Sequence, residues 1–130
     1  MSARTGSVLD AVPTERIERA APTVERWVAV ATVLLYGVGD VATTYVSEQL
    51  GGYESNQLVW GLLHEYGSIA LVGHKAAAFA LIVAGWLAIT ALARLVDHRP
   101  HVYRAAFLSL YAGRGLVLTV SNATVIYQLL

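Results

Sequence analysis

The sequence predicts an all-α integral membrane protein, a helical bundle of three long transmembrane helices and a short interfacial or re-entrant helix at about 56–67. Two features of its composition predict this class. Of the 130 residues, 56% are hydrophobic and only 14% are charged, whereas an average soluble domain has roughly 25% charged residues. A soluble chain this small exposes much of its surface to water. These charges are too few to cover that surface, so the composition argues against a soluble globular domain.

Residues 1–26 are expected to form a polar cytoplasmic segment, and residues 27–130 the transmembrane helical domain. The polar segment contains four arginines and two prolines, and its apolar residues follow a helical period only loosely. We expect it to be partly disordered and partly an interfacial helix. A new helix is predicted after Pro22, with Thr23 as its N-cap. No short apolar core with a small-residue cleavage site follows, so the segment does not resemble a signal peptide.

Three apolar stretches predict the long helices, at about 27–46, 69–93 and 105–130. Twenty helical residues at 1.5 Å per residue span the roughly 30 Å of a hydrocarbon core. The polar loop 47–56 ends at Asn56, a residue type that caps helices well. The apolar run that follows is short and interrupted. It is therefore predicted to be a short helix on the outer side of the membrane.

The distribution of arginines predicts the orientation. The connection at 94–104 contains Arg94, Arg99 and Arg104, while 47–72 contains neither lysine nor arginine. Cytoplasmic loops of membrane proteins carry the excess of basic residues. Three spans with a cytoplasmic N-terminus place all these arginines inside, whereas four spans would place the 94–104 loop outside. We therefore expect a multi-pass protein of the cytoplasmic membrane with three spans.

Polar residues inside the predicted spans are the candidate site. A charge at the bilayer centre costs about 2.5–3.5 kcal/mol on insertion scales, so each one needs an explanation. Asp40 and Arg114 lie well inside spans, and Lys75 lies at the mouth of one. The set could be an ion pair that locks the helices, a site for a ligand, ion or proton, or groups that reach to water. Which cation pairs with Asp40 is left open. The candidates are Asp40, Thr43, Thr44, Glu54, Asn56, His74, Lys75 and Arg114.

Small residues recur every fourth position in the second span, and this spacing lets helix backbones approach closely in lipid. The partner of this face could be another helix of the chain or a second copy. The residues are Ala76, Ala80, Ala84 and Ala88.

Several chemistries lack support. The formal net charge is 0, which gives no basic patch for nucleic acid, and the chain has no cysteine. His64 and His74 could share a metal with a nearby glutamate, but their spacing matches no compact metal motif. No hydrolase or phosphate-binding motif is present. We therefore predict no catalytic residues, no metal and no cofactor.

The stretch 39–75 resembles a family of small prokaryotic membrane proteins catalogued as domain of unknown function 5658. The matching pattern is an Asp in the first span, paired threonines, a glycine-containing loop with Glu-x-Asn, and a Lys that opens the next apolar helix. Gln57 stands where the family pattern has a proline. The resemblance implies an integral membrane protein and supplies no activity. The matched residues are Asp40, Thr43, Thr44, Gly51, Gly52, Glu54, Asn56 and Lys75.

Three functions follow from these patterns. The first is a non-enzymatic helix-packing subunit or scaffold, whose partners are the lipid bilayer, a second copy or other membrane proteins. The second is an oligomeric transport component for ions, protons or small solutes, with Asp40 and its neighbours as ligands. The third is an intramembrane enzyme acting on a lipid, with Asp40, Glu54 and His74 as acid and base groups. The absence of a catalytic motif favours the first.

Overall fold

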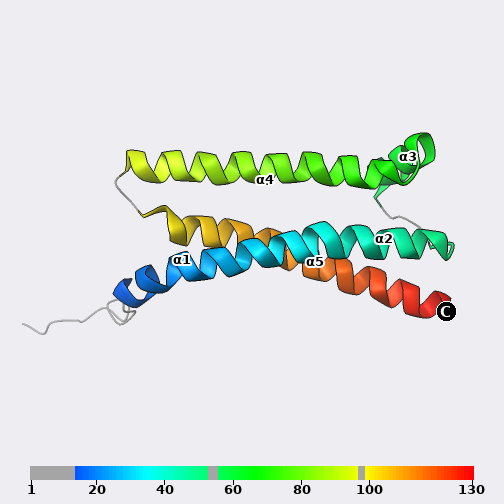
Figure 1. Ribbon diagram of the computed structural model, residues 1–130, viewed down its shortest axis with the longest axis horizontal. Coiled ribbons are helices and arrows are strands. Elements are labelled where there is room, and N and C mark those ends of the chain that lie inside the picture. Colours follow the sequence, from blue (N-terminus) through cyan, green and yellow to red (C-terminus); the bar gives the residue numbers. More distant parts are fainter. Residues whose placement is uncertain (1–13, 53–55, 97–98) are drawn as a thin grey trace, which may run out of the picture.

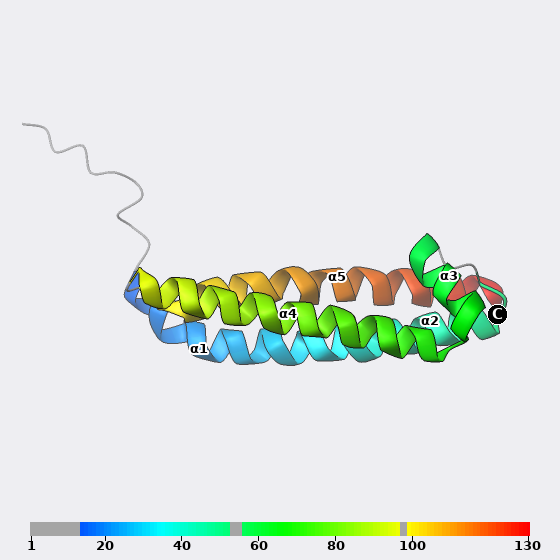
Figure 2. The ribbon, with the colours of Figure 1, turned by 90° about the horizontal axis from the view of Figure 1, so that it is seen from above.

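The computed structural model describes residues 14–52, 56–96 and 99–130, and in these residues all regular structure is helical, which confirms the all-α class. Three long helices lie side by side and a short one lies across one end (Figures 1 and 2). The first long helix is continuous from residue 14 to 49 and contains a π-helical segment, η2. The elements are α1 (Thr14–Ala31), η2 (Thr32–Gly39), α2 (Asp40–Gln49), α3 (Gln57–Tyr66), α4 (Ile69–Leu95) and α5 (Pro100–Leu129).

The first helix begins earlier than the sequence predicts. It starts at Thr14 and continues through Pro22, so the predicted helix start at Thr23 is wrong. A proline inside a helix removes one backbone hydrogen bond. Here Ala21 and Glu25, on either side of the proline, are buried against the rest of the protein. This burial stabilises the continuous helix despite the lost hydrogen bond.

The starts of the other helices follow the expected local signals. The side chain of Asn56 accepts a hydrogen bond of 3.1 Å from the amide of Leu58, which confirms the predicted cap and the short helix. The last helix starts at Pro100 instead of about residue 105. Proline is favoured in the first helical turn because its missing N–H would be unpaired there in any case.

Two helices, Thr14–Gln49 and Ile69–Leu95, are long and apolar enough to cross a membrane. Only 22% and 17% of the residues in their most apolar windows are buried. These low fractions distinguish them from the core helix of a soluble protein, which buries most of its apolar residues. α5 is 30 residues long, but its most apolar stretch is more polar than theirs, and it is not among the described helices apolar enough to cross a membrane.

The closest packing joins α5 to the first helix. Gly115 of α5 is buried directly against the backbone of Leu35 and Tyr36 in η2. The hydroxyl of Thr119 donates a 3.1 Å hydrogen bond to the carbonyl of Leu35. One turn from Tyr36, Thr32 is 2% exposed, and its hydroxyl lies within hydrogen-bond distance of a carbonyl of each helix. Small residues and hydroxyl groups therefore let these two helices approach closely.

Thr32→Val is expected to lower the free energy of unfolding by about 1–2 kcal/mol, because the carbonyl of Leu108 loses its 3.1 Å contact with the hydroxyl. Thr124→Val is the matched control. The Thr124 hydroxyl is exposed and donates only within its own helix, to Val120. Unfolding of both variants in detergent micelles measures the difference. Equal effects would show that the contact between the helices contributes nothing.

Most of the small-residue stripe of α4 faces away from the other described helices. The side of α4 that packs on the other helices carries Phe79, Ile82 and Trp86 instead. Ala76 also borders the space between α4 and the first helix. The four exposed members of the stripe are Ala76, Ala80, Ala84 and Ala88.

Candidate functional site

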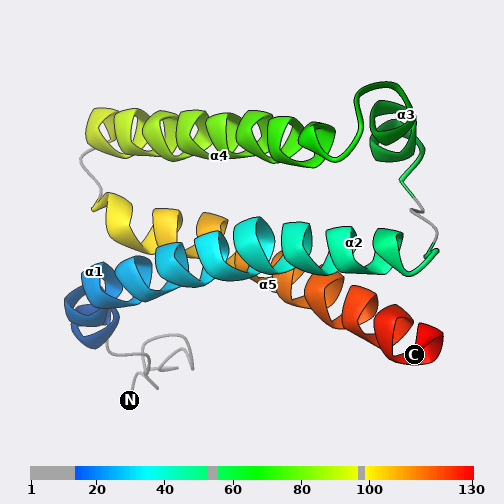
Figure 3. The ribbon, with the colours of Figure 1, turned by 45° about the vertical axis from the view of Figure 1, so that its right-hand side comes forward.

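Asp40 and Lys75 form an ion pair between the first helix and α4. The lysine Nζ lies 2.5 Å from Oδ2 of Asp40, and only 13% and 11% of the Lys75 and Asp40 side chains are exposed. Asp40 is the first residue of α2, and Lys75 lies in the second turn of α4. α2 and the first turns of α4 lie toward the end of the bundle that carries α3, which we call the α3 end (Figure 3). Lys75, and not Arg114, is thus the partner of Asp40.

The second oxygen of Asp40 is held by α5 and by α2 itself. The side-chain amide of Asn122 lies 3.2 Å from Oδ1 and 2.9 Å from the Thr44 hydroxyl. Thr44 lies 3.4 Å from the same carboxylate oxygen, and Thr43 contributes a further contact of 3.2 Å to Asn122. The carboxylate therefore has partners from all three long helices, and two of the candidate threonines belong to this network.

The ring of Tyr36 completes the surroundings of the ion pair. Lys75 Nζ lies 3.6 Å from the centre of this ring, a cation–π contact. The ring is held edge-on by Phe79 and Tyr111, at centre-to-centre distances of 6.0 and 5.8 Å. Tyr36 lies in η2, and the amide of Asp40 donates to the carbonyl of Leu35, five residues earlier. Such π-helical turns occur often at functional sites.

A cavity of about 240 Å³ lies beside the ion pair. Six of the eight candidate residues line it, and Ser121, Asn122 and Tyr36 contribute to its walls. Arg114 is exposed, and His74 is partly buried. Thr43 reaches the cluster only through Asn122, and Glu54 lies outside the described residues. The six are Asp40, Thr44, Asn56, His74, Lys75 and Arg114.

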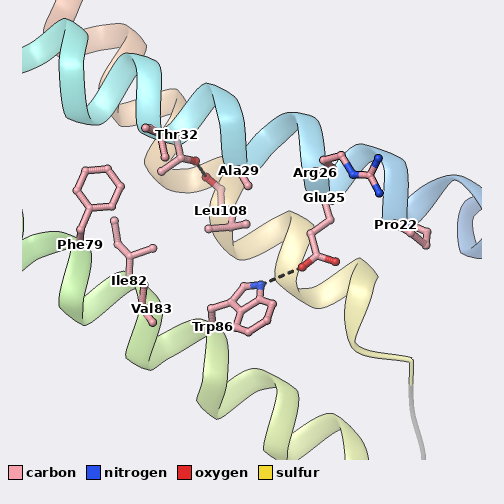
Figure 4. A pocket seen from close by; sticks show the side chains of 11 residues that line it. Pro22, Glu25, Arg26, Ala29, Thr32, Phe79, Ile82, Val83, Trp86 and Leu108 are labelled. Atoms are coloured by element: carbon pink, nitrogen blue, oxygen red, sulfur yellow. Dashed lines mark hydrogen bonds between the residues drawn. The ribbon is translucent and has the colours of Figure 1, made fainter.

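A second polar cluster joins the same three helices at the opposite end of the bundle. Glu25 of α1 is 8% exposed, and its two carboxylate oxygens lie 2.8 and 3.0 Å from nitrogens of Arg104 on α5. The indole of Trp86 on α4 donates a 2.9 Å hydrogen bond to Glu25 (Figure 4). Arg104 also donates to Thr90 at 3.1 Å, and His101 lies 2.5 Å from Glu25. This cluster was not predicted.

One signal in the sequence could have found the second cluster. Glu25 precedes the predicted first span by two residues, and Arg104 precedes the predicted third span by one. Three alternating spans bring these two helix ends to the same side of a membrane. The predicted polar segment 1–26 includes Glu25, so this residue is not among the candidates for a site.

The chemistry of the site at the α3 end follows from its charges. Because Lys75 neutralises Asp40, no unpaired carboxylate is left in the described cavity wall to hold a cation. In residues 14–52, 56–96 and 99–130, no group of three histidine, aspartate or glutamate residues could hold a metal ion. The described cavity wall also contains the hydroxyl of Ser121 and the guanidinium of Arg114. A guanidinium has only hydrogen-bond donors and therefore recognises acceptors and anions.

No family model matches the chain, and neither a curated protein nor a solved structure matches it. The resemblance to the family catalogued as domain of unknown function 5658 therefore remains a prediction.

Proposed function

We propose that this chain is a three-span subunit of the cytoplasmic membrane with its N-terminus in the cytoplasm, and that it acts by helix packing and not by catalysis. Two helices are long and apolar enough to cross a bilayer, and they support this placement. α5 is antiparallel to α4 and lies against the first helix (Figure 1), and this arrangement supports our assignment of α5 as the third span. Membership in the family that the sequence resembles is part of the same proposal.

The spacing of the two polar clusters supports the membrane placement. Glu25 and Asp40 are 15 residues apart on one helix, which corresponds to about 22 Å at 1.5 Å per residue. A hydrocarbon core is roughly 30 Å thick. With the Glu25 cluster at the inner boundary, the Asp40 cluster lies in the outer half. Between them the core consists of Tyr36, Ile82 and Leu108.

The saturation of Asp40 is the observation that carries the packing role. Its carboxylate is bound by Lys75 and Asn122, so the first helix, α4 and α5 are tied together at one point. In hydrocarbon, hydrogen bonds between helices contribute on the order of 1 kcal/mol each. Both carboxylate oxygens of Asp40 already have partners within the chain, which favours a structural role over that of an acid or base in a reaction.

The exposed stripe of α4 supplies a surface for association. Its four alanines cover three successive helical turns, and all four are exposed in the described chain. Small side chains allow two helices to approach closely, which is the main source of helix association in lipid. We therefore assign to this stripe the contact with a second copy.

Cross-linking of single cysteines tests this association, and the absence of native cysteines makes the result unambiguous. Ala80→Cys, in the stripe, is expected to give an oxidised product of twice the chain mass in native membranes. Leu110→Cys on α5, where the side chain is 73% exposed, is the control and is expected to stay monomeric. Gel electrophoresis without reductant distinguishes the two. Equal cross-linking at both positions would indicate random collision.

A transport component is the second candidate, because the cavity adjoins the ion pair. Three spans are few for a carrier, so this function would need an oligomer. Flux of protons or cations into liposomes containing the protein, lost in Asp40→Ala, would support transport and contradict the packing role. Under our proposal Asp40→Ala changes stability, and the flux of both proteins equals that of protein-free liposomes.

A further inference from the structure

We propose that the polar cavity and an adjoining apolar groove form one binding site for a membrane lipid with a phosphate headgroup. The phosphate lies in the cavity near Arg114 and Lys75, and an acyl chain lies in the groove between the first helix and α4. This inference goes beyond the packing role and rests on the proposed placement of the three long helices in the membrane. Three observations carry it: the charge of the cavity, the continuity of the two spaces, and their sizes.

The described wall of the cavity has an excess of positive charge. Asp40 and Lys75 neutralise each other at 2.5 Å, and Arg114 adds one further cation. In the part of the chain that the structure describes, Arg114 forms no ion pair and no hydrogen bond. A guanidinium near the middle of a span needs an anionic or polar partner. Arginine binds phosphate through two parallel hydrogen bonds, so phosphate satisfies this need well.

An apolar groove of about 780 Å³ meets the cavity along a shared wall. Val41, Leu71 and Lys75 line both spaces. The groove lies between η2 and α2 on one side and α4 on the other, and apart from Lys75 its lining carries no charged side chain. A molecule in the bilayer can therefore reach the polar cavity laterally. An anion with an apolar tail matches this combination better than a free anion does.

The apolar surface continues along the bundle. A further space of about 410 Å³ shares Val33 and Phe79 with the groove and extends toward Trp86 (Figure 4). Ligand pockets commonly enclose roughly 300–1,000 Å³. The cavity of about 240 Å³ holds a headgroup of phosphate size, and the spaces beyond it accommodate an extended acyl chain.

Native mass spectrometry of the purified full chain in an uncharged detergent measures lipid binding and tests which headgroup the site prefers. The probes are dioleoyl phosphatidate and dioleoyl phosphatidylcholine, which share their acyl chains. We expect phosphatidate to bind at least tenfold more tightly. Arg114→Gln is expected to abolish this preference, while Arg94→Gln, an exposed arginine at the other end of α4, retains it. Circular dichroism verifies that both variants stay helical. A preference that survives Arg114→Gln would overturn the proposal.

A second pair of variants tests the groove. Val72→Trp fills it, because Val72 is 59% exposed and lines it, and phosphatidate affinity is expected to fall about tenfold. Leu81→Trp is the control, since Leu81 is 73% exposed and lies outside the groove. Competition with inorganic phosphate tests whether the site binds a free anion or the headgroup of a lipid. If phosphate displaces phosphatidate while Val72→Trp has no effect, the site takes free phosphate and the lipid assignment is wrong. If Val72→Trp lowers phosphatidate affinity no more than Leu81→Trp does, the acyl chain does not lie in the groove, which also overturns the proposal.

Discussion

Asp40→Asn is expected to lower the free energy of unfolding by about 3–5 kcal/mol, the range for breaking a buried ion pair from one side. The reason is the lysine left behind. Lys75 is 13% exposed and would keep its charge beside the Tyr36 ring without a carboxylate to balance it. Lys75→Met is expected to have an effect of similar size, because it leaves the Asp40 carboxylate buried with only neutral partners.

The double variant Asp40→Asn, Lys75→Met distinguishes an ion pair from two independent effects. Removing both charges together is expected to cost clearly less than the sum of the single variants, because no unpaired charge remains. Reversible unfolding in micelles of the wild type, both single variants and the double variant gives the coupling free energy. The exposed pair of Glu18 and Arg99, at 3.2 Å, is the control, with an expected coupling below about 1 kcal/mol. If Asp40→Asn alone leaves the free energy of unfolding unchanged, the ion pair does not stabilise the contact between the helices.

Gly115→Ala is expected to destabilise the protein by about 3 kcal/mol, at the upper end of the range for overpacking. A Cβ at this position would overlap the backbone of Tyr36 and lie 2.7 Å from the carbonyl carbon of Leu35. Backbone atoms cannot rotate away as a flexible side chain can. The two closest helices must therefore separate, which would also disturb the nearby hydrogen bond from Thr119 to Leu35.

Gly113→Ala is the matched control in the same helix. Apart from the neighbouring residues of its own helix, no atom of the described residues lies within 4 Å of the Cβ that this change adds. Alanine is favoured over glycine in helices by about 1 kcal/mol, so this variant is expected to be neutral or slightly more stable. The two unfolding free energies, measured in the same detergent, give the effect of the helix contact. If Gly115→Ala is as stable as Gly113→Ala, the close approach of α5 and η2 is wrong.

Much of the fold was predictable, because it depends on local signals. Apolar length predicted α4 to within two residues, and the cap at Asn56 predicted α3. The helix start at Thr23 was wrong because a proline is a local signal, whereas burial of Ala21 and Glu25 depends on other helices. Local rules do not contain that information.

Some members of the candidate site were predicted, but Asn122, Tyr36 and the pairing of Asp40 were not. Asp40 and Lys75 were identified by the rule that a charge inside a span needs a partner. The choice of Lys75 over Arg114 depends on how each helix is rotated about its axis, which one sequence does not determine. Likewise, the face of α4 that carries Ala80 was identified, but its outward direction follows only from which side Phe79 and Ile82 occupy.

The π-helical segment sets the rotational phase of the first helix. In an α-helix each residue turns by about 100°, so a wider turn shifts every later residue around the axis relative to the earlier ones. Glu25 lies before η2 and Asp40 after it, and each meets a different cation. The segment therefore sets the angle between the side of the first helix that carries Glu25 and the side that carries Asp40. A regular α-helix over the same residues could align one of these acids with its cation, but would turn the other away.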